Sequence, residues 1–149
     1  MGYHIEAYYL SGHHDAPEIL ASPDDVDALV DRLLELPAAT NTAALYLMER
    51  TTLSSGFPDH EMYLAVDADL RVGAIRFTDA DGTWATLGNP DGRADVRYHL
   101  AGHETIFPPH SDVRLDLVRQ GGKEFLTSGG NRPECLTWQP VLDGPFAKG

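Results

Sequence analysis

Two histidine pairs are the first residues in the sequence whose types and spacing could support chemistry. His99 and His103 stand four residues apart, a spacing that lets two histidines on one helix bind zinc. The segment is instead typical of a strand followed by a turn at Gly102, and no adjacent acidic motif supplies a third ligand. We therefore expect no metal site here, and we expect the other pair, His13 and His14, on a solvated loop between Gly12 and Pro17.

Candidate nucleophiles are equally sparse. Cys135 is the only cysteine, and we expect it to be a small buried side chain in a strand. The segment Ser54-Ser55-Gly56 lacks the strand–turn–helix pattern of a nucleophile elbow. The acidic loop 79–82 lacks the later glutamate of a calcium-binding hand. These patterns predict no catalytic residues and no cofactor, so we expect a protein that is not an enzyme, although an active site assembled from scattered residues stays open as an alternative.

Charge is the most informative feature of the composition. The chain of 149 residues has 23 acidic and 11 basic side chains, and residues 1–104 hold 18 of the acids but only 6 of the bases. This imbalance disfavours binding to nucleic acid or to anionic membranes, because both are polyanions. It favours a basic protein partner, with plain solubility as the alternative explanation.

Membrane and export signals are missing from the sequence. No apolar run approaches the ~18 residues that a membrane helix needs, and the first residues have neither the basic nor the apolar region of a signal peptide. A lone cysteine excludes an internal disulfide. We therefore expect a cytoplasmic protein.

Two helices are predicted from capping and periodicity. Ser22 can cap a helix that starts at Pro23 and stops before Pro37, with apolar residues at helical spacing and acids in its first turns. A second helix is predicted over 113–126. It contains Gly121-Gly122, which we expect to be tolerated because the helix backbone packs closely on a sheet.

Strands are predicted between and around these helices. The ranges are 4–10, 43–49, 61–66, 71–78, 83–87, 96–100, a short partner near 104–107, and 134–138. Asp81-Gly82 between apolar runs predicts a hairpin. The order predicts an α+β fold, a mainly antiparallel sheet with two helices packed on one face. We expect one domain over 1–141 and a flexible tail over 142–149.

The end of the chain carries the most specific pattern. Phe107-Pro108-Pro109-His110-Ser111 leads into a helix ending Lys123-Glu124-Phe125-Leu126-Thr127, followed after a glycine by Arg132-Pro133-Glu134 and Leu136-Thr137-Trp138. Together with the acidic early helix and the strand meander, this ending resembles the first-numbered Imm class of bacterial immunity proteins over roughly residues 23–141. Two departures are Gly121-Gly122, where the family usually has alanines, and an apparent extra residue between Phe125 and Arg132.

The resemblance implies an antitoxin that binds the toxin domain encoded beside it. In this family the toxin is often a zinc-type nucleic-acid deaminase, including deaminases that act on double-stranded DNA. It implies a structural role for the signature residues Phe125, Arg132, Pro133, Leu136 and Trp138, and we expect Trp138 to pack on the second helix. A non-catalytic adaptor or a secretion-chaperone-like protein is the alternative.

Charge and family together suggest how such an antitoxin would work. A toxin that acts on DNA needs a basic substrate groove, which an acidic partner can occupy in a 1:1 complex with a monomer of this chain. We expect the toxin to bind the strand meander and its loops, with the first helix as the rival acidic surface. The predicted toxin-binding residues are Phe57, Asp59, Glu61, Asp67, Asp69, Asp79, Asp81, Trp84, Asp91 and Asp95. Tyr63 is a further possible anchor, and for both Tyr63 and Trp84 burial in the core is the alternative role.

Overall fold

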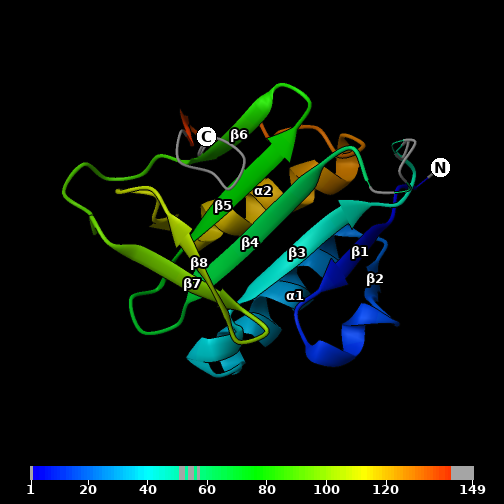
Figure 1. Ribbon diagram of the computed structural model, residues 1–149, viewed down its shortest axis with the longest axis horizontal. Helices are drawn as coiled ribbons and strands as arrows, with labels where there is room; N and C mark the ends of the chain where they lie inside the picture. The colour runs from blue at the N-terminus through cyan, green and yellow to red at the C-terminus, as the bar shows by residue number, and fades with distance from the viewer. Residues whose placement is uncertain (1, 51–52, 54–55, 57, 142–149) are drawn as a thin grey trace.

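The computed structural model describes residues 2–50, 53, 56 and 58–141 and shows two helices behind a large antiparallel sheet (Figure 1). The predicted α+β class, with both helices on one face, is confirmed. The elements are β1 (Ile5–Tyr8), η1 (Ser11–His14), β2 (Glu18–Leu20), α1 (Pro23–Glu35), η2 (Ala38–Thr40), β3 (Thr42–Leu47), β4 (Glu61–Asp67), β5 (Val72–Asp79), β6 (Gly82–Thr86), β7 (Val96–Leu100), β8 (His103–Phe107), β9 (Val113–Arg114), α2 (Leu115–Thr127) and β10 (Trp138–Pro140).

The main sheet has the strand order β10-β6-β5-β4-β3-β1-β2, and β9 adds to the end of β5. The predicted meander is confirmed as β4, β5 and β6. Its second turn joins Asp79 to its partner Gly82, which takes a φ of +143°. Two short strands were missed: β2 has only three residues, and the two residues of β9 were predicted as helix.

Helix α1 forms as its sequence predicts. The Ser22 hydroxyl accepts the Asp25 N–H at 3.3 Å, and the Asp25 carboxylate accepts the Ser22 N–H at 3.2 Å. This reciprocal pair satisfies two backbone donors that a helix start would otherwise leave open. The apolar stripe of Val26, Leu29, Val30 and Leu33 is fully buried against the sheet.

Helix α2 starts two residues later than predicted, because Val113 and Arg114 pair with β5. Its two glycines allow the close packing that we expected. A Cβ on Gly121 would lie 2.8 Å from Ile75 Cδ1, and one on Gly122 would lie 2.9 Å from Val26 Cγ1. Since both distances are shorter than van der Waals contact, the glycines let α2 approach both the sheet and α1.

The prediction of a strand over 134–138 was wrong. The Glu124 carboxylate accepts the backbone N–H groups of Glu134 at 2.5 Å and Cys135 at 3.2 Å, and these residues form a turn. The strand begins only at Trp138, which pairs with β6. Burial and the Glu124 carboxylate raise the pKa of the Cys135 thiol to about 11, so the thiol stays protonated at neutral pH.

A separate hairpin of β7 and β8 lies across the face of the sheet opposite the helices (Figure 1). Its buried residues Val96, Tyr98 and Phe107 pack on a floor of three alanines, Ala65, Ala74 and Ala85. Small side chains on the floor let the hairpin sit close to the sheet. The hairpin covers one end of this face and leaves the rest open.

The structure contains no helix, within its described residues, that is long and apolar enough to cross a membrane.

Candidate functional site

The uncovered part of the sheet carries three tyrosines that we call the tyrosine face: Tyr8, Tyr46 and Tyr63, with Glu6 and Glu61. Strand alternation places them opposite the helices, since Glu6 pairs with Tyr46, and Tyr63 packs on the alanine floor of the hairpin. The rings of Tyr8 and Tyr46 meet edge to face at 5.7 Å between centroids. All five side chains are half-buried. Tyrosine is enriched at binding hot spots because it combines a large apolar ring with a polar tip.

Hydrogen bonds hold two of these tyrosines in place. The Tyr46 hydroxyl donates to Glu61 Oε2 at 2.5 Å, and the Tyr8 hydroxyl donates to Glu6 Oε1 at 3.4 Å. Burial, and next the negative charge of Glu61, raise the pKa of Tyr46. The hydroxyl therefore stays a donor at physiological pH, and the ring stays fixed. A fixed aromatic side chain loses little conformational entropy when a partner binds.

Four of the predicted toxin-binding residues lie at the end of the sheet where β4 starts and β5 ends, and we call them the acidic end: Asp59, Glu61, Asp79 and Asp81. Alternation places Glu61 on the open face with Tyr63, and Asp79 on the helix-covered face with Phe77. Glu61 starts β4 opposite Thr78. Asp79 and Asp81 lie at the β5–β6 turn, where Asp79 Oδ1 accepts the Asp81 N–H at 2.9 Å. Within the described residues, no cationic side chain forms an ion pair with Glu61, Asp79 or Asp81. Their charge is therefore available to a partner.

Asp59 is the exception at this end. Its carboxylate lies 3.0 Å from Arg50 Nη2 and 2.9 Å from His60 Nδ1. His60 is buried, and its Nε2 accepts the Leu47 N–H at 2.8 Å. Burial lowers the pKa of His60, which matches a neutral ring that donates from Nδ1 and accepts at Nε2. The sequence offered no signal for this network because Arg50 and Asp59 lie on either side of a loop.

The predicted residues Asp67 and Asp69 lie at the opposite end of β4, ~20 Å away at the rise of a seven-residue strand. Asp67 Oδ1 accepts the N–H groups of Asp69 at 3.0 Å and Leu70 at 2.9 Å, so the side chain stabilises the β4–β5 turn. Its other oxygen lies 3.6 Å from Arg93 Nη1. The structure thus does not bring the predicted acids into one patch.

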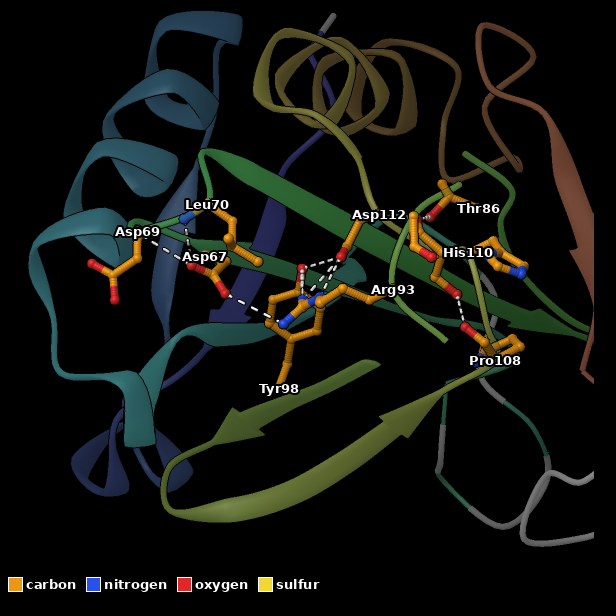
Figure 2. Close-up of polar contacts among 11 residues, drawn as sticks. Asp67, Asp69, Leu70, Thr86, Arg93, Tyr98, Pro108, His110 and Asp112 are labelled. Carbon is orange, nitrogen blue, oxygen red and sulfur yellow. Dashed lines mark hydrogen bonds and ion pairs between the residues drawn. The ribbon is translucent and has the colours of Figure 1, made fainter. Parts of the chain in front are cut away.

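Figure 2 shows the polar contacts at this end of the sheet. Arg93 donates from Nε to Asp112 Oδ2 at 2.7 Å and from Nη2 to Oδ1 at 3.2 Å, and the Tyr98 hydroxyl donates to the same Oδ1 at 2.5 Å. The Asp112 side chain is only 8% exposed. We call these residues, with Asp67, the hairpin network. It fastens the β7–β8 hairpin to the sheet, and no local pattern in the sequence indicated it.

The remaining predicted residues are dispersed. Asp91 and Asp95 are exposed in the segment before β7, and Asp95 pairs with Arg97 at 2.8 Å. Trp84 points to the helix side of the sheet, where the Arg132 guanidinium lies 4.1 Å from its ring centroid. Phe57 lies outside the described residues.

The signature residues of the chain's end pack around α2. Phe125 is fully buried, and Pro133 and Leu136 are also buried. Trp138 is half-buried against the main core, and its Nε1 donates to the Pro133 carbonyl at 2.8 Å. The Arg132 guanidinium lies over Trp84 and 5.9 Å from Trp138, which stabilises it by cation–π attraction.

The rival acidic surface, on α1, is neutralised within the protein at two of its acids. Asp27 lies 2.7 Å from Lys123 and 3.2 Å from Arg119, and Asp31 lies 2.6 Å from the same arginine. The hydrogen bond from Lys123 is the main cause that lowers the pKa of Asp27. These acids join α1 to α2 and have little charge left for a partner.

A groove of about 850 Å³ lies next to the tyrosine face. Its floor includes Tyr63 and Arg76 of the sheet, and its wall is β8 with Glu104, Ile106 and the prolines that follow. In the described part of the chain, Arg76 forms no ion pair, and no three His, Cys, Asp or Glu side chains cluster as metal ligands would. The geometry is that of a binding surface with a hollow at one side.

Comparison with protein families gives a match to the model described as "Immunity protein Imm1" over residues 14–140, which is most of the chain. Comparison with curated protein sequences gives no match. The family match includes Tyr46, Tyr63 and Glu61 of the tyrosine face, but not Tyr8 and Glu6, and it spans the hairpin network and the α2 ending.

Proposed function

The chain belongs to the Imm1 family of immunity proteins, which neutralise cognate toxins and are generally non-catalytic inhibitors, and we propose that it acts through its tyrosine face and acidic end. The residues that we propose for toxin contact are Tyr8, Tyr46, Tyr63, Glu61, Asp79 and Asp81. This proposal keeps three of the acids predicted at one end of the meander and the possible anchor Tyr63, and it adds Tyr8 and Tyr46.

The observation that carries the proposal is the contrast between paired and available acids. Asp27 and Asp31 on α1 and Asp67 at the far end of β4 are held by cations of the protein itself. Within the described residues Glu61, Asp79 and Asp81 have no such partner, and neither have Asp24 and Glu35 of α1, so the neighbouring aromatic side chains decide between the two surfaces. Half-buried tyrosines beside Glu61 supply apolar area at low entropic cost. Together they form the pattern of an interface: aromatic anchors with a charged rim.

We propose that the toxin acts on nucleic acid, and specifically that it is a cytidine deaminase acting on DNA. Two features support this choice: the resemblance of the chain's ending to a family often paired with such toxins, and the formal charge of −12. A DNA-binding toxin presents a basic groove, and an acidic inhibitor that covers it would compete directly with substrate. Any zinc in the complex would belong to the toxin.

We also propose a 1:1 complex, formed in the cytoplasm by a monomer of this chain. The tyrosine face is a single contiguous surface, which fits one toxin molecule. The single half-buried cysteine needs no oxidising compartment.

The test is binding to the purified toxin domain encoded by the neighbouring gene. Tyr46→Ala and Tyr63→Ala should each weaken binding by about tenfold or more, as for other interface anchors. Tyr3→Ala is the matched control, because Tyr3 is exposed and lies against Gly129 beyond α2. If the control weakens binding as much as the two variants, the tyrosine face is not the interface. If the native protein does not bind this domain, the partner is wrong.

A further inference from the structure

The outer edge of β8 has unpaired backbone groups. β7 and β8 are joined by the two-residue turn Ala101-Gly102, so the pair that closes the turn, Leu100 and His103, is hydrogen-bonded. Along the hairpin, every second pair is hydrogen-bonded, and in the pairs between them the backbone N–H and C=O groups point outward. In this pattern the backbone groups of His99 point away from β8. There the Asn41 N–H donates to the His99 carbonyl at 3.0 Å, and the His99 N–H donates to Asn41 Oδ1 at 2.8 Å. These two bonds confirm which backbone groups of the hairpin point outward.

The equivalent outward residues on β8 are Glu104 and Ile106. Within the described residues, no group forms a hydrogen bond with their outward N–H and C=O. The Ile106 side chain is 58% exposed. An unpaired edge with an exposed apolar side chain is a template for another strand.

The other sheet edges are less suited to pairing. β2 and β10 have three residues each, and β10 ends in Pro140, which has no N–H. β8 has five residues without proline. It is also the edge that borders the groove, whose floor of Tyr63 and Arg76 continues into the tyrosine face.

We propose that an extended segment of the toxin pairs with the outer edge of β8 and fills this groove. The inference rests on the proposed function and names the way in which that surface holds its partner. Main-chain hydrogen bonds to Glu104 and Ile106 fix the segment, and side chains at alternate positions set its specificity.

The neighbours of the added strand define its chemistry. A residue opposite Glu104 is Lys or Arg, and a residue opposite Ile106, two positions away, is apolar. Glu104 and Asp95 lie at the rim with side chains 43% and 72% exposed, and among the described residues both pair with the single cation Arg97. Residues facing the groove meet the Arg76 guanidinium, which favours a carboxylate or carbonyl oxygen there.

The decisive variant pair is Ile106→Pro against Ile106→Ala, tested with the same toxin domain. Both remove the isoleucine side chain, but only proline removes the outward N–H, and an outward edge position tolerates proline. We expect Ile106→Pro to bind at least tenfold more weakly than Ile106→Ala, with equal midpoints of urea unfolding. Equal affinities of the two variants would overturn the strand-pairing proposal.

Amide exchange measured by NMR on the unaltered protein gives a second test that does not depend on a variant folding. The Glu104 and Ile106 amides should exchange fast in the free protein and slowly in the complex. Fast exchange in both states, or slow exchange already in the free protein, would rule out a toxin strand at this edge. Tyr46→Ala separates the two hypotheses: if it abolishes binding while both edge tests fail, the proposed interface stands without the added strand.

Discussion

The two faces of the sheet carry similar residue types, acids and aromatic side chains, in different environments. On the helix-covered face, Asp27 and Asp31 of α1 are paired with cations of α2, and aromatic side chains such as Phe125 are fully buried. On the open face, Glu61 has no cationic partner among the described residues, and Tyr46 and Tyr63 stay half-buried. The first arrangement holds the fold together, and the second leaves interaction capacity for a partner.

The hairpin makes the same contrast within the open face. Where β7 and β8 cover the sheet, the carboxylate of Asp112 is buried and paired with Arg93. Where they do not, Glu61 is half-buried and has no cationic partner among the described residues. Counting acids along the chain therefore overstates the surface available to a basic partner.

The largest expected effect is loss of stability on the helix-covered face. Phe125→Ala should lower the free energy of unfolding by about 3–5 kcal/mol, because Phe125 is fully buried against His60 and Phe77. Urea denaturation measures this, with Ile19→Ala as the control: Ile19 is 46% exposed and pairs with Glu6 on the other face. Toxin affinity of the folded fraction should not change. Weakened affinity at native stability would place the interface on the helix side.

A somewhat smaller effect is expected under the hairpin. Arg93→Ala leaves the Asp112 carboxylate buried without its ion-pair partner and should cost about 3 kcal/mol. The matched control is Arg97→Ala, which breaks two exposed ion pairs on the same hairpin and should cost much less. Equal losses measured by urea denaturation would show that the hairpin network does not fasten the hairpin.

A moderate effect is expected on association rate. Asp79→Lys with Asp81→Lys should slow toxin association by roughly tenfold at low salt, because these acids steer a basic partner toward the tyrosine face. Asp69→Lys with Asp91→Lys changes the net charge equally at exposed sites outside the acidic end. Stopped-flow rates across a salt series distinguish local from global steering. If the two double variants slow association equally, the acidic end has no special role.

Local sequence signals predicted the parts of the fold whose causes are local. The Ser22 cap, the apolar stripe of α1 and the Asp81-Gly82 turn act over a few residues, and the structure has them where predicted. The turn at 134–137 was missed because its cause, the Glu124 carboxylate, lies ten residues away in the sequence. Because the Glu124 carboxylate binds the backbone N–H groups of Glu134 and Cys135, these residues form a turn and not a strand.

For the candidate site, the sequence predicted the types of residue involved but not which of them pair with one another. Alternation shows which acids share a face of a strand, but not which acids find a cation. Asp67 meets Arg93, which comes 26 residues later by number, and Asp27 meets Lys123 from the other helix. The hairpin's position decides how much of the tyrosine face stays open, and that position depends on the alanines at 65, 74 and 85. Neither fact can be read from local patterns.

The smallest effect, a pH dependence centred on His60, connects the two faces. The ring touches Phe125 on one side and Tyr46 on the other, and it is surrounded by Asp59, Arg50 and Asp79. Because burial lowers the pKa of His60 in the folded protein, its stabilising contribution is present above the unfolded pKa of about 6.5 and is lost as pH falls. A single such group can change the free energy of unfolding by at most about 0.7 kcal/mol between pH 7 and pH 6.

The control variant is His60→Gln, which keeps an acceptor for the Leu47 N–H and a donor for Asp59 but does not titrate. The difference between the pH profiles of unfolding free energy of the two proteins therefore isolates the His60 ring. If the two profiles run parallel from pH 7 to pH 5, His60 does not titrate on unfolding. If instead toxin affinity falls with pH while stability does not, the ring acts through Tyr46 on the open face and not through Phe125 on the helix-covered one.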